Sequence, residues 1–295
     1  MRMQRFNRFL TAALAPSLFS VGSLAAGSIA LGGLAACDSD SGASTSVPGL
    51  EVHLYGPSGA ADPFAGVASA YEVRIDGAPV WAHAASTPLP PASLTKLMTA
   101  LLVVEADRLD EVVTVDGRSA AATGSRLGLR PGDRWRVADL LTAALVASAN
   151  DACRALAQWH DGSEAKFVAR MNRRAAALGL VRTHFVNACG HDAPGHVSSA
   201  DDLARLAEVA MAQPAIAERV RHPTAQIADA DGAHAVTLRN RNALVGRYPG
   251  AIGVKSGFTA RAGKCVIAMA ERGGARVLLV LLNGRDRWWD AHAIL

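Results

Sequence analysis

The chain has 295 residues, of which 50% are hydrophobic and 19% are charged, so it can bury one sizeable core in one or two lobes. Three of its 30 basic residues, and none of its 26 acidic residues, precede residue 37. The rest of the chain, with 27 basic against 26 acidic residues, is nearly neutral and has no basic stripe. This balance excludes nucleic acid as an expected partner.

The first 36 residues resemble an export signal. They begin with a positive stretch, and an uncharged run of small and apolar residues follows over residues 10–36. A membrane-spanning anchor is the alternative, but the Gly and Ser content of the run and the small residues before Cys37 favour a cleaved signal. The basic residues of the positive stretch are Arg2, Arg5 and Arg8.

The end of this run indicates a lipid anchor. Leu34-Ala35-Ala36-Cys37 resembles the processing box of bacterial lipoproteins, in which the cysteine becomes the lipidated N-terminus; ordinary cleavage nearby is the alternative. Residues 37–49 are rich in Ser, Gly, Asp and Thr and predict a flexible tether. We therefore expect an exported protein whose globular domain, residues 50–295, is held at the periplasmic or extracytoplasmic face of a membrane.

Three further cysteines, Cys153, Cys189 and Cys265, lie among apolar or small residues. Because their number is odd, they cannot all pair in disulfides, and buried free thiols are the expectation. A Cys153–Cys189 disulfide is the alternative in an exported protein. No Cys or His spacing suggests metal ligands, and His191 and His196 do not share one helix face. Neither a metal nor a cofactor is predicted.

The globular part begins with a hairpin, with strands expected over 68–74 and 80–84 around the turn Asp76-Gly77. The prolines of residues 88–91 end this sheet, and a helix starts at about Ala92. Further helices are predicted over 137–147, 151–159, 164–178 and 200–212, strands over 236–239, 252–255, 265–270 and 276–282, and a last helix from 288. Strands thus bracket a helical middle, which predicts an α/β (α+β) fold with a helical lobe inserted at about 116–234.

Three short motifs occur in order along this pattern. They are Ser93-Leu94-Thr95-Lys96, Ser148-Ala149-Asn150 and Lys255-Ser256-Gly257. Each is a weak signal alone, because such short strings arise by chance on helix faces, at turns and at strand ends. Their order, their wide spacing and the element on which each falls make a joint coincidence improbable, since the chain has only four lysines.

The first motif suits a nucleophile and its base. Ser93 and Lys96 are three residues apart on a helix, so their side chains share a face. A lysine that is buried near a second cation loses its proton more readily, and Lys255 is a candidate for that cation. Lys96 would then accept the proton of Ser93 as the serine attacks a carbonyl carbon.

The other two motifs suit substrate contacts. Ser148 could relay a proton to a leaving amine, and Asn150 could hold a substrate amide. Lys255 and Ser256 suit a carboxylate, because an ammonium and a hydroxyl both donate to it. Gly257 would let a substrate backbone lie close to its strand.

The backbone N–H groups of Ser93 and Phe258 are predicted to form an oxyanion hole, since both would point to the attacked carbonyl oxygen.

The motif set resembles that of the low-molecular-mass penicillin-binding proteins, the serine D-alanyl-D-alanine carboxypeptidases of peptidase family S11. The resemblance covers roughly residues 64–295 and extends to Pro91–Ala100, Met171-Asn172, Asn187 with Gly190, and Tyr248-Pro249-Gly250. It implies a β-lactamase/transpeptidase-like fold, in which helices flank a central antiparallel sheet and an all-helical lobe is inserted.

The resemblance also implies a function. The protein would cleave the terminal D-Ala-D-Ala bond of peptidoglycan stem peptides through an acyl-Ser93 intermediate, and β-lactam antibiotics would inhibit it. A D,D-endopeptidase acting on cross-links is a close alternative. A β-lactamase is less favoured, because no Glu-x-x-Leu-Asn string lies between Asn150 and Lys255. A non-catalytic wall-binding lipoprotein would not need an intact Ser93–Lys96 pair.

The chain departs from the family pattern in four places. Lys-Ser-Gly replaces Lys-Thr-Gly but keeps the hydroxyl, and Phe258 follows where some relatives carry His. The sequence ends at Leu295, where many relatives continue into a β-domain and an anchor helix, and a lipid on Cys37 is expected to replace that anchor. Arg287 resembles an arginine that relatives place near the substrate carboxylate, with a structural salt bridge as the alternative.

Overall fold

A computed structural model describes residues 62–295. The predicted export signal, the lipidation site Cys37 and the tether lie outside the described residues. The elements are β1 (Ala68–Ile75), β2 (Ala78–His83), the 3₁₀ turn η1 (Ala92–Thr95), α2 (Lys96–Glu105), β3 (Val112–Thr114), α3 (Gly117–Ala120), β4 (Arg134–Arg136), α4 (Val137–Val146), α5 (Asn150–Asp161), α6 (Glu164–Ala177), α7 (Ala200–Met211), α8 (Pro214–Val220), β5 (Thr224–Ala228), β6 (Ala235–Arg239), β7 (Ala251–Thr259), β8 (Gly263–Arg272), β9 (Ala275–Gly284) and α9 (Arg287–Ile294).

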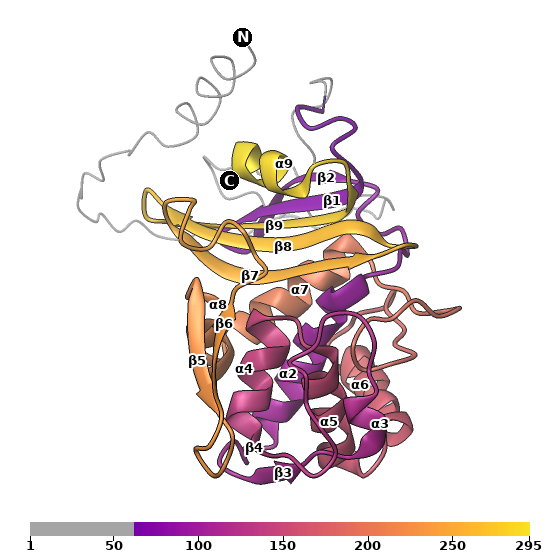
Figure 1. The fold of residues 1–295 in the computed structure, drawn as a ribbon. Helices are drawn as coiled ribbons and strands as arrows, with labels where there is room; N and C mark the ends of the chain where they lie inside the picture. Colours follow the sequence, from indigo (N-terminus) through magenta and orange to yellow (C-terminus); the bar gives the residue numbers. More distant parts are fainter. Residues whose placement is uncertain (1–61) are drawn as a thin grey trace, which may run out of the picture. The chain divides into compact units, whose positions relative to one another are not determined.

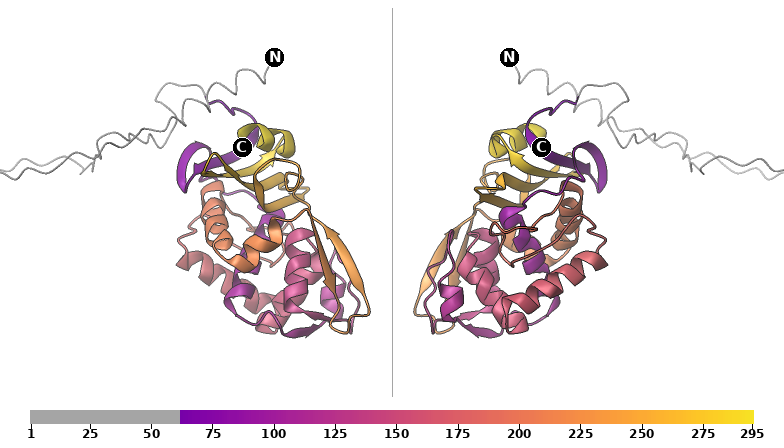
Figure 2. Two further views of the ribbon diagram at one scale, coloured as in Figure 1. Left: turned by 90° about the vertical axis from the view of Figure 1, so that its left-hand side faces the viewer. Right: turned by 90° about the vertical axis from the view of Figure 1, so that its right-hand side faces the viewer.

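The central sheet is antiparallel and has five strands in the order β2-β1-β9-β8-β7. The first strand of the chain, β1, pairs with the last, β9, so the sheet is assembled from both ends of the sequence. Figure 1 shows α9 on one face of this sheet and the other helices on the opposite face, and the side views of Figure 2 show the same layers. The predicted α/β fold is confirmed.

Both faces of the sheet are covered, and the strand sequences reflect this. The middle six residues of β8 and of β9 are all buried, because α9 packs on one side and α7 on the other. Continuous apolar runs such as Val277–Leu282 are typical of strands buried on both faces. The edge strand β7 belongs to this covered sheet and contacts η1 and α8 of the helical layer.

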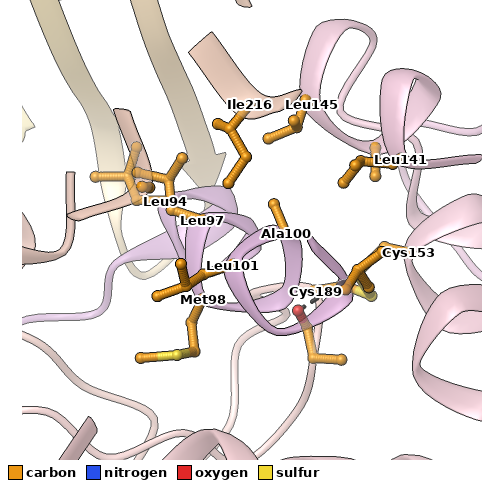
Figure 3. Packing of buried hydrophobic residues seen from close by; sticks show 14 of the residues in the cluster. Leu94, Leu97, Met98, Ala100, Leu101, Leu141, Leu145, Cys153, Cys189 and Ile216 are labelled. Carbon is orange, nitrogen blue, oxygen red and sulfur yellow. Dashed lines mark hydrogen bonds between the residues drawn. A yellow bond between two sulfur atoms is a disulfide. The ribbon is translucent and has the colours of Figure 1, made fainter. Parts of the chain in front are cut away.

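Helix α2 forms the centre of the helical layer. Most of its residues are apolar, and those from Lys96 to Val103 are buried, as is typical of a central rather than a surface helix. Figure 3 shows side chains of α4 and α8 around it. The core residues labelled there include Leu97, Leu101, Leu141, Leu145 and Ile216.

Three short strands, β3, β4 and β5, escaped the sequence prediction, whereas β6 lies where the strand over 236–239 was expected. The β3–β4 pair and the β5–β6 hairpin are separate two-stranded sheets, and because β4 and β5 fall within 116–234, that segment is mainly but not entirely helical. Strands of three residues, such as Arg134–Arg136, are too short to show a period-2 pattern.

The start of α5 also differs from expectation. The helix predicted over 151–159 begins at Asn150, and its cap position is Ala149, in an extended conformation and without a side-chain hydrogen bond. The Asp151 carboxylate instead accepts hydrogen bonds from the backbone N–H groups of residues 127–129. It therefore fixes a neighbouring loop against α5, a long-range role that a local cap pattern cannot reveal.

The expectation of buried free thiols is wrong for two of the three cysteines. Cys153 of α5 and Cys189 form a disulfide, with their Cα atoms 6.0 Å apart, a usual separation for such a bond. Cys265 of β8 is a buried free thiol, and burial raises its pKa to about 11. Across residues 62–295, no helix has the combination of length and hydrophobicity that a membrane span requires.

Candidate active site

The three sequence motifs meet where the helical layer contacts the edge of the sheet. Ser93 lies in η1 and Lys96 is the first residue of α2, whereas Ser148 lies between α4 and α5. The Lys-Ser-Gly motif lies within β7, which contacts η1 (Figure 1). The structure thus brings together segments that are more than 160 residues apart, Ser93 and Lys255.

Lys96 is buried among neutral oxygen atoms. Its side chain is 1% exposed, and Nζ lies 3.0 Å from Ser93 Oγ, 2.7 Å from Asn150 Oδ1 and 2.7 Å from the Cys189 carbonyl oxygen. Burial, followed by the charge of Lys255, lowers the Lys96 pKa well below its usual value. A neutral amine at this place can accept the Ser93 proton, which a protonated one cannot.

Lys255 is buried to the same extent and links the third motif, to which it belongs, to the second. Its Nζ donates to Ser148 Oγ and to the Ser256 carbonyl oxygen, each at 2.9 Å. Burial, Arg287 and Arg241 lower its pKa to about 7. Its ammonium is therefore occupied by protein oxygen atoms, and the hydroxyl of Ser148 is linked directly to it.

Two residues beside the reactive hydroxyl groups have left-handed backbone conformations. Ala92, directly before Ser93, has a φ of 48°, and Ser148 has a φ of 59°. Such values strain a residue other than glycine and persist where surrounding contacts fix them. Thr95 Oγ1 donates to the Ala92 carbonyl oxygen at 2.7 Å, which fixes the first of these turns.

Gly257 permits the close contact of β7 with η1. A Cβ atom at this position would lie 3.0 Å from both the Ser93 nitrogen and the Ala92 Cβ, so a larger residue would push the strand away. Phe258 follows on the same edge, with its side chain 63% exposed. The oxyanion hole formed by the Ser93 and Phe258 N–H groups stays a prediction. The Ser93 nitrogen lies beside Gly257 of β7, next to Phe258.

The loop of residues 187–191, which carries one of the Lys96 acceptors, was not predicted to contribute. The side-chain oxygen of Asn187 accepts from the N–H groups of Cys189, Gly190 and His191, and so folds the loop into a tight turn. Asn187 and Gly190 belong to the family resemblance, but no local pattern indicates that the carbonyl between them contacts Lys96.

Gly190 lets this loop pack against η1. It has a φ of 87°, and a Cβ atom there would lie 1.9 Å from the Ala92 carbonyl oxygen. The strained turn before Ser93 and the loop that holds Lys96 therefore touch each other, and only glycine fits between them.

Asn150 links Lys96 to a histidine that sequence reasoning did not place in the site. Its Oδ1 accepts from Lys96, so its Nδ2 is the donor to the Thr123 carbonyl oxygen at 2.6 Å and to His191 Nε2 at 3.1 Å. His191 must then accept through Nε2, as the neutral ring. Burial lowers the pKa of His191, which agrees with this state.

Arg287 and Arg241 add positive charge beside β7. Arg287 donates through Nη1 to the Gly257 carbonyl oxygen, and its Cζ lies 4.7 Å from the Trp288 ring centre. It forms no salt bridge with another residue of 62–295. Arg241 was missed by sequence reasoning; its carbonyl oxygen accepts from Ser256 Oγ at 3.2 Å.

Four basic side chains thus gather at the site without an acidic partner: Lys96, Lys255, Arg241 and Arg287 form no ion pair with a carboxylate in residues 62–295. Such a group favours an anionic substrate. Within the same residues, no cluster of His, Cys, Asp or Glu side chains could hold a metal ion.

Comparison with known proteins identifies the family. The family model described as peptidase S11, D-alanyl-D-alanine carboxypeptidase, matches residues 76–286. The chain belongs to this family. The carboxypeptidase DacB2 of Mycobacterium tuberculosis is 35% identical over 213 residues, which cover 70% of this chain and 72% of that protein. DacF of Bacillus subtilis is 36% identical over 200 residues, and the chain spans about half the length of that relative, 51%.

Solved structures agree with the sequence relatives. The crystal structure of a D-alanyl-D-alanine carboxypeptidase from Mycobacterium tuberculosis has a TM-score of 0.75 at 32% identity and covers 81% of this chain and 93% of its own. A mutant form of the Streptomyces K15 DD-transpeptidase has a TM-score of 0.72 at 29% identity, with coverage of 77% and 98%. The predicted assignment to the serine-type D-Ala-D-Ala carboxypeptidases is confirmed.

Proposed function

We propose that this protein releases the terminal D-alanine from peptidoglycan stem peptides through an acyl-enzyme at Ser93, and that penicillin acylates the same serine. The observation that carries the proposal is the buried Lys96, whose Nζ lies 3.0 Å from Ser93 Oγ and has only neutral oxygen atoms as hydrogen-bond partners. A lysine with a depressed pKa beside a serine hydroxyl is the arrangement that a serine nucleophile requires.

The reaction follows from these contacts. Lys96 Nζ takes the proton of Ser93 Oγ, which attacks the carbonyl carbon of the penultimate D-alanine. The N–H groups of Ser93 and Phe258 stabilise the oxyanion. Collapse of the tetrahedral intermediate breaks the peptide bond, and the leaving amine takes a proton by way of Ser148, whose hydroxyl is hydrogen-bonded to Lys255. Water then attacks the ester and restores the free serine.

The cation group supports recognition of a free carboxylate. Arg241 and Arg287 lie beside β7, the strand against which the terminal D-alanine would lie, and Ser256 of that strand adds a hydroxyl. An Arg or Lys paired with a hydroxyl donor fits a carboxylate well. Where the acceptor amine of a cross-link lies next to a free carboxylate, the same group would suit that cross-link, and a D-alanyl-D-alanine endopeptidase of Pseudomonas aeruginosa is 32% identical to this chain over 203 residues. Endopeptidase activity is therefore the second candidate.

The test is the release of free D-alanine from a stem pentapeptide by the purified protein, with and without penicillin. Release that penicillin abolishes, and that is absent in Ser93→Ala, is the expected result. Release that persists in Ser93→Ala would contradict the acyl-serine route. If only cross-linked muropeptides are cleaved, the endopeptidase interpretation replaces the carboxypeptidase one.

The location of the protein is proposed from the sequence. We infer that the signal of residues 1–36 is removed and that Cys37 is lipidated, which would hold the catalytic domain at the outer face of a membrane near its substrate. Cys37→Ser should transfer the protein from the membrane fraction to a soluble or uncleaved form. Unchanged fractionation would contradict lipidation.

A further inference from the structure

The two oxygen atoms that hold Lys96 Nζ from either side belong to different segments. Asn150 Oδ1 comes from the first turn of α5, and the Cys189 carbonyl oxygen comes from the 187–191 loop. Each lies 2.7 Å from Nζ. The position of the lysine therefore depends on the distance between these two segments.

The Cys153–Cys189 disulfide joins these two segments covalently. Cys153 is one helical turn after Asn150 on α5, and Cys189 itself supplies the carbonyl oxygen that Lys96 contacts. Figure 3 shows the bond at the edge of the core, beside α2. Both cysteines are fully buried among apolar side chains, so the bond lies beneath the site rather than at the surface.

Other contacts tie the loop to elements that do not carry the second acceptor. The Ala188 carbonyl oxygen accepts from Thr99 of α2 at 2.6 Å, and the Ala188 N–H donates to Glu164 of α6 at 3.1 Å. Between the loop and the Asn150 side chain there is one hydrogen bond, from Asn150 Nδ2 to His191 Nε2. Lys96 Nζ itself contacts both segments, and the two sulfur atoms lie near the Ala188 and Asn150 carbonyl oxygen atoms. The disulfide is the covalent link between the loop and the start of α5.

We propose that Cys153 and Cys189 are positioning residues for the general base: their disulfide fixes the separation of the two oxygen atoms that hold Lys96 Nζ beside Ser93 Oγ. The inference rests on the proposed function, in which Lys96 is that base. The bond forms by exchange with an oxidising protein or small-molecule disulfide, which accepts two electrons and is reduced to two thiols. Export would place the chain where such bonds persist.

Without the disulfide, the two oxygen atoms that hold Lys96 Nζ can move apart, and the rate of acylation should fall. A misplacement of about 1 Å in a reacting group can lower a rate about a hundredfold. Water that reaches Lys96 would also return its pKa toward the ordinary value, since burial is the main cause of the present shift. The titratable groups that face Lys96 are Lys255, whose charge also lowers the Lys96 pKa, and His191, which lies in the loop itself.

The first experiment asks whether the bond exists. A tryptic digest of the alkylated, non-reduced full chain should contain residues 137–154 linked to residues 183–205, as cleavage after Arg136, Arg154, Arg182 and Arg205 predicts. Recovery of both peptides as separate alkylated species would overturn the proposal. The free thiol of Cys265 should be alkylated in either case and serves as the internal control.

The second experiment compares Cys153→Ala/Cys189→Ala with wild type and with Cys265→Ala. The second-order rate constant for acylation by a fluorescent penicillin should fall between about tenfold and a hundredfold in the double variant, and its acid limb should move to higher pH. Cys265→Ala should match wild type. Equal rate constants and equal pH profiles in all three would overturn the proposal, whereas failure of wild type to acylate would refute the proposed function instead.

A third measurement covers a double variant that does not fold. Dithiothreitol is raised until both wild-type cysteines become alkylatable; the protein disulfide gains two electrons and dithiothreitol becomes a cyclic disulfide. Acylation should slow, and should recover when oxidised glutathione restores the bond. A reduced protein that still acylates at the wild-type rate would refute the positioning role.

Discussion

The molecule buries cations in two regions, and it treats them differently. In the sheet, buried Arg74 of β1 pairs with Glu72 at 2.6 Å and with Glu208 of α7 at 2.8 Å. At the active site, Lys96 and Lys255 have only hydroxyl, amide and carbonyl oxygen atoms as partners. Carboxylates keep a buried cation charged, whereas burial without them drives a lysine toward its neutral form. The first arrangement supports the fold, and the second supports proton transfer.

The largest expected effect comes from making the base permanently charged. Lys96→Arg keeps a basic side chain of similar length, but a guanidinium stays charged because it cannot give up its proton to become a base. The rate constant for acylation by penicillin should fall by about 10²–10⁴-fold, the usual contribution of general-base catalysis. A Lys96→Arg protein that acylates within about threefold of wild type at every pH would show that Lys96 is not the base.

Asn150→Asp would convert the active-site arrangement into the one found at Arg74. It places a carboxylate at the position of Asn150 Oδ1, 2.7 Å from Lys96 Nζ, with almost no change of shape. An adjacent opposite charge stabilises the protonated lysine and raises its pKa by about 1–3 units. Acylation should therefore decline at neutral pH, by at most about 10–10³-fold, and recover as the pH is raised.

The matched control for this variant is Asn150→Ala. It also removes the contact to Lys96 but adds no charge, so its loss of activity should not be reversed by alkaline pH. The comparison fails if the two variants have the same pH profile.

Breaking the pair in the sheet should affect stability and spare catalysis. Arg74→Met leaves the Glu72 carboxylate buried without its main partner, a change that typically destabilises by about 3–5 kcal/mol. Burial already raises the Glu72 pKa in the presence of Arg74. The variant should unfold at lower urea concentration, while penicillin acylation of the folded protein stays at the wild-type rate.

Adding Glu72→Gln to Arg74→Met removes the unpaired charge and should recover part of the lost stability. If the single and double variants have the same free energy of unfolding, the buried carboxylate is not the cause of the loss.

The sequence predicted the residues of this site better than their partners. The spacing of Ser93 and Lys96, the helix break at Ser148 and the strand of Lys255 are local features, and the structure places these motifs together. The Cys189 carbonyl, the disulfide and the link of Lys255 to Ser148 depend on contacts between segments far apart in the chain. A backbone carbonyl belongs to every residue, so no amino-acid type at position 189 could mark it as the Lys96 acceptor.

The same distinction explains the fold. Apolar runs such as Val277–Leu282 and the hairpin turn at Asp76-Gly77 are local signals, and they predicted the correct strands. Which strand joins which depends on packing: the segment from Val236 to Arg239 has a strand pattern like the others, yet it pairs only with β5 outside the main sheet. The role of Asp151 was missed for this reason too, because its partners lie in a loop more than 20 residues earlier.

The smallest expected effect tests a buried base that the fold keeps neutral without using it in the reaction. His196 Nδ1 accepts from the Val186 N–H at 2.9 Å, and its Nε2 lies 2.9 Å from Thr95 Oγ1, which itself donates to the Ala92 carbonyl oxygen. Nε2–H is therefore the donor to Thr95, and the ring is neutral. Burial is the main cause that lowers the His196 pKa from 6.5 to about 4.

The sign of the resulting pH dependence follows from this shift. Between these two pKa values the unfolded chain binds a proton at His196 and the folded protein does not, so acid favours unfolding. The stabilisation that the folded protein gains by keeping His196 neutral is fully present above pH 6.5 and is lost as the pH falls to about 4. It amounts to about 3 kcal/mol of unfolding free energy. In urea unfolding, His196→Gln should be less stable than wild type at pH 7, and the difference should narrow steadily toward pH 4. A difference that is the same at both pH values would mean that His196 contributes through packing alone. Lys96 and Lys255 would then be the buried bases whose pKa values are lowered because no carboxylate lies beside them.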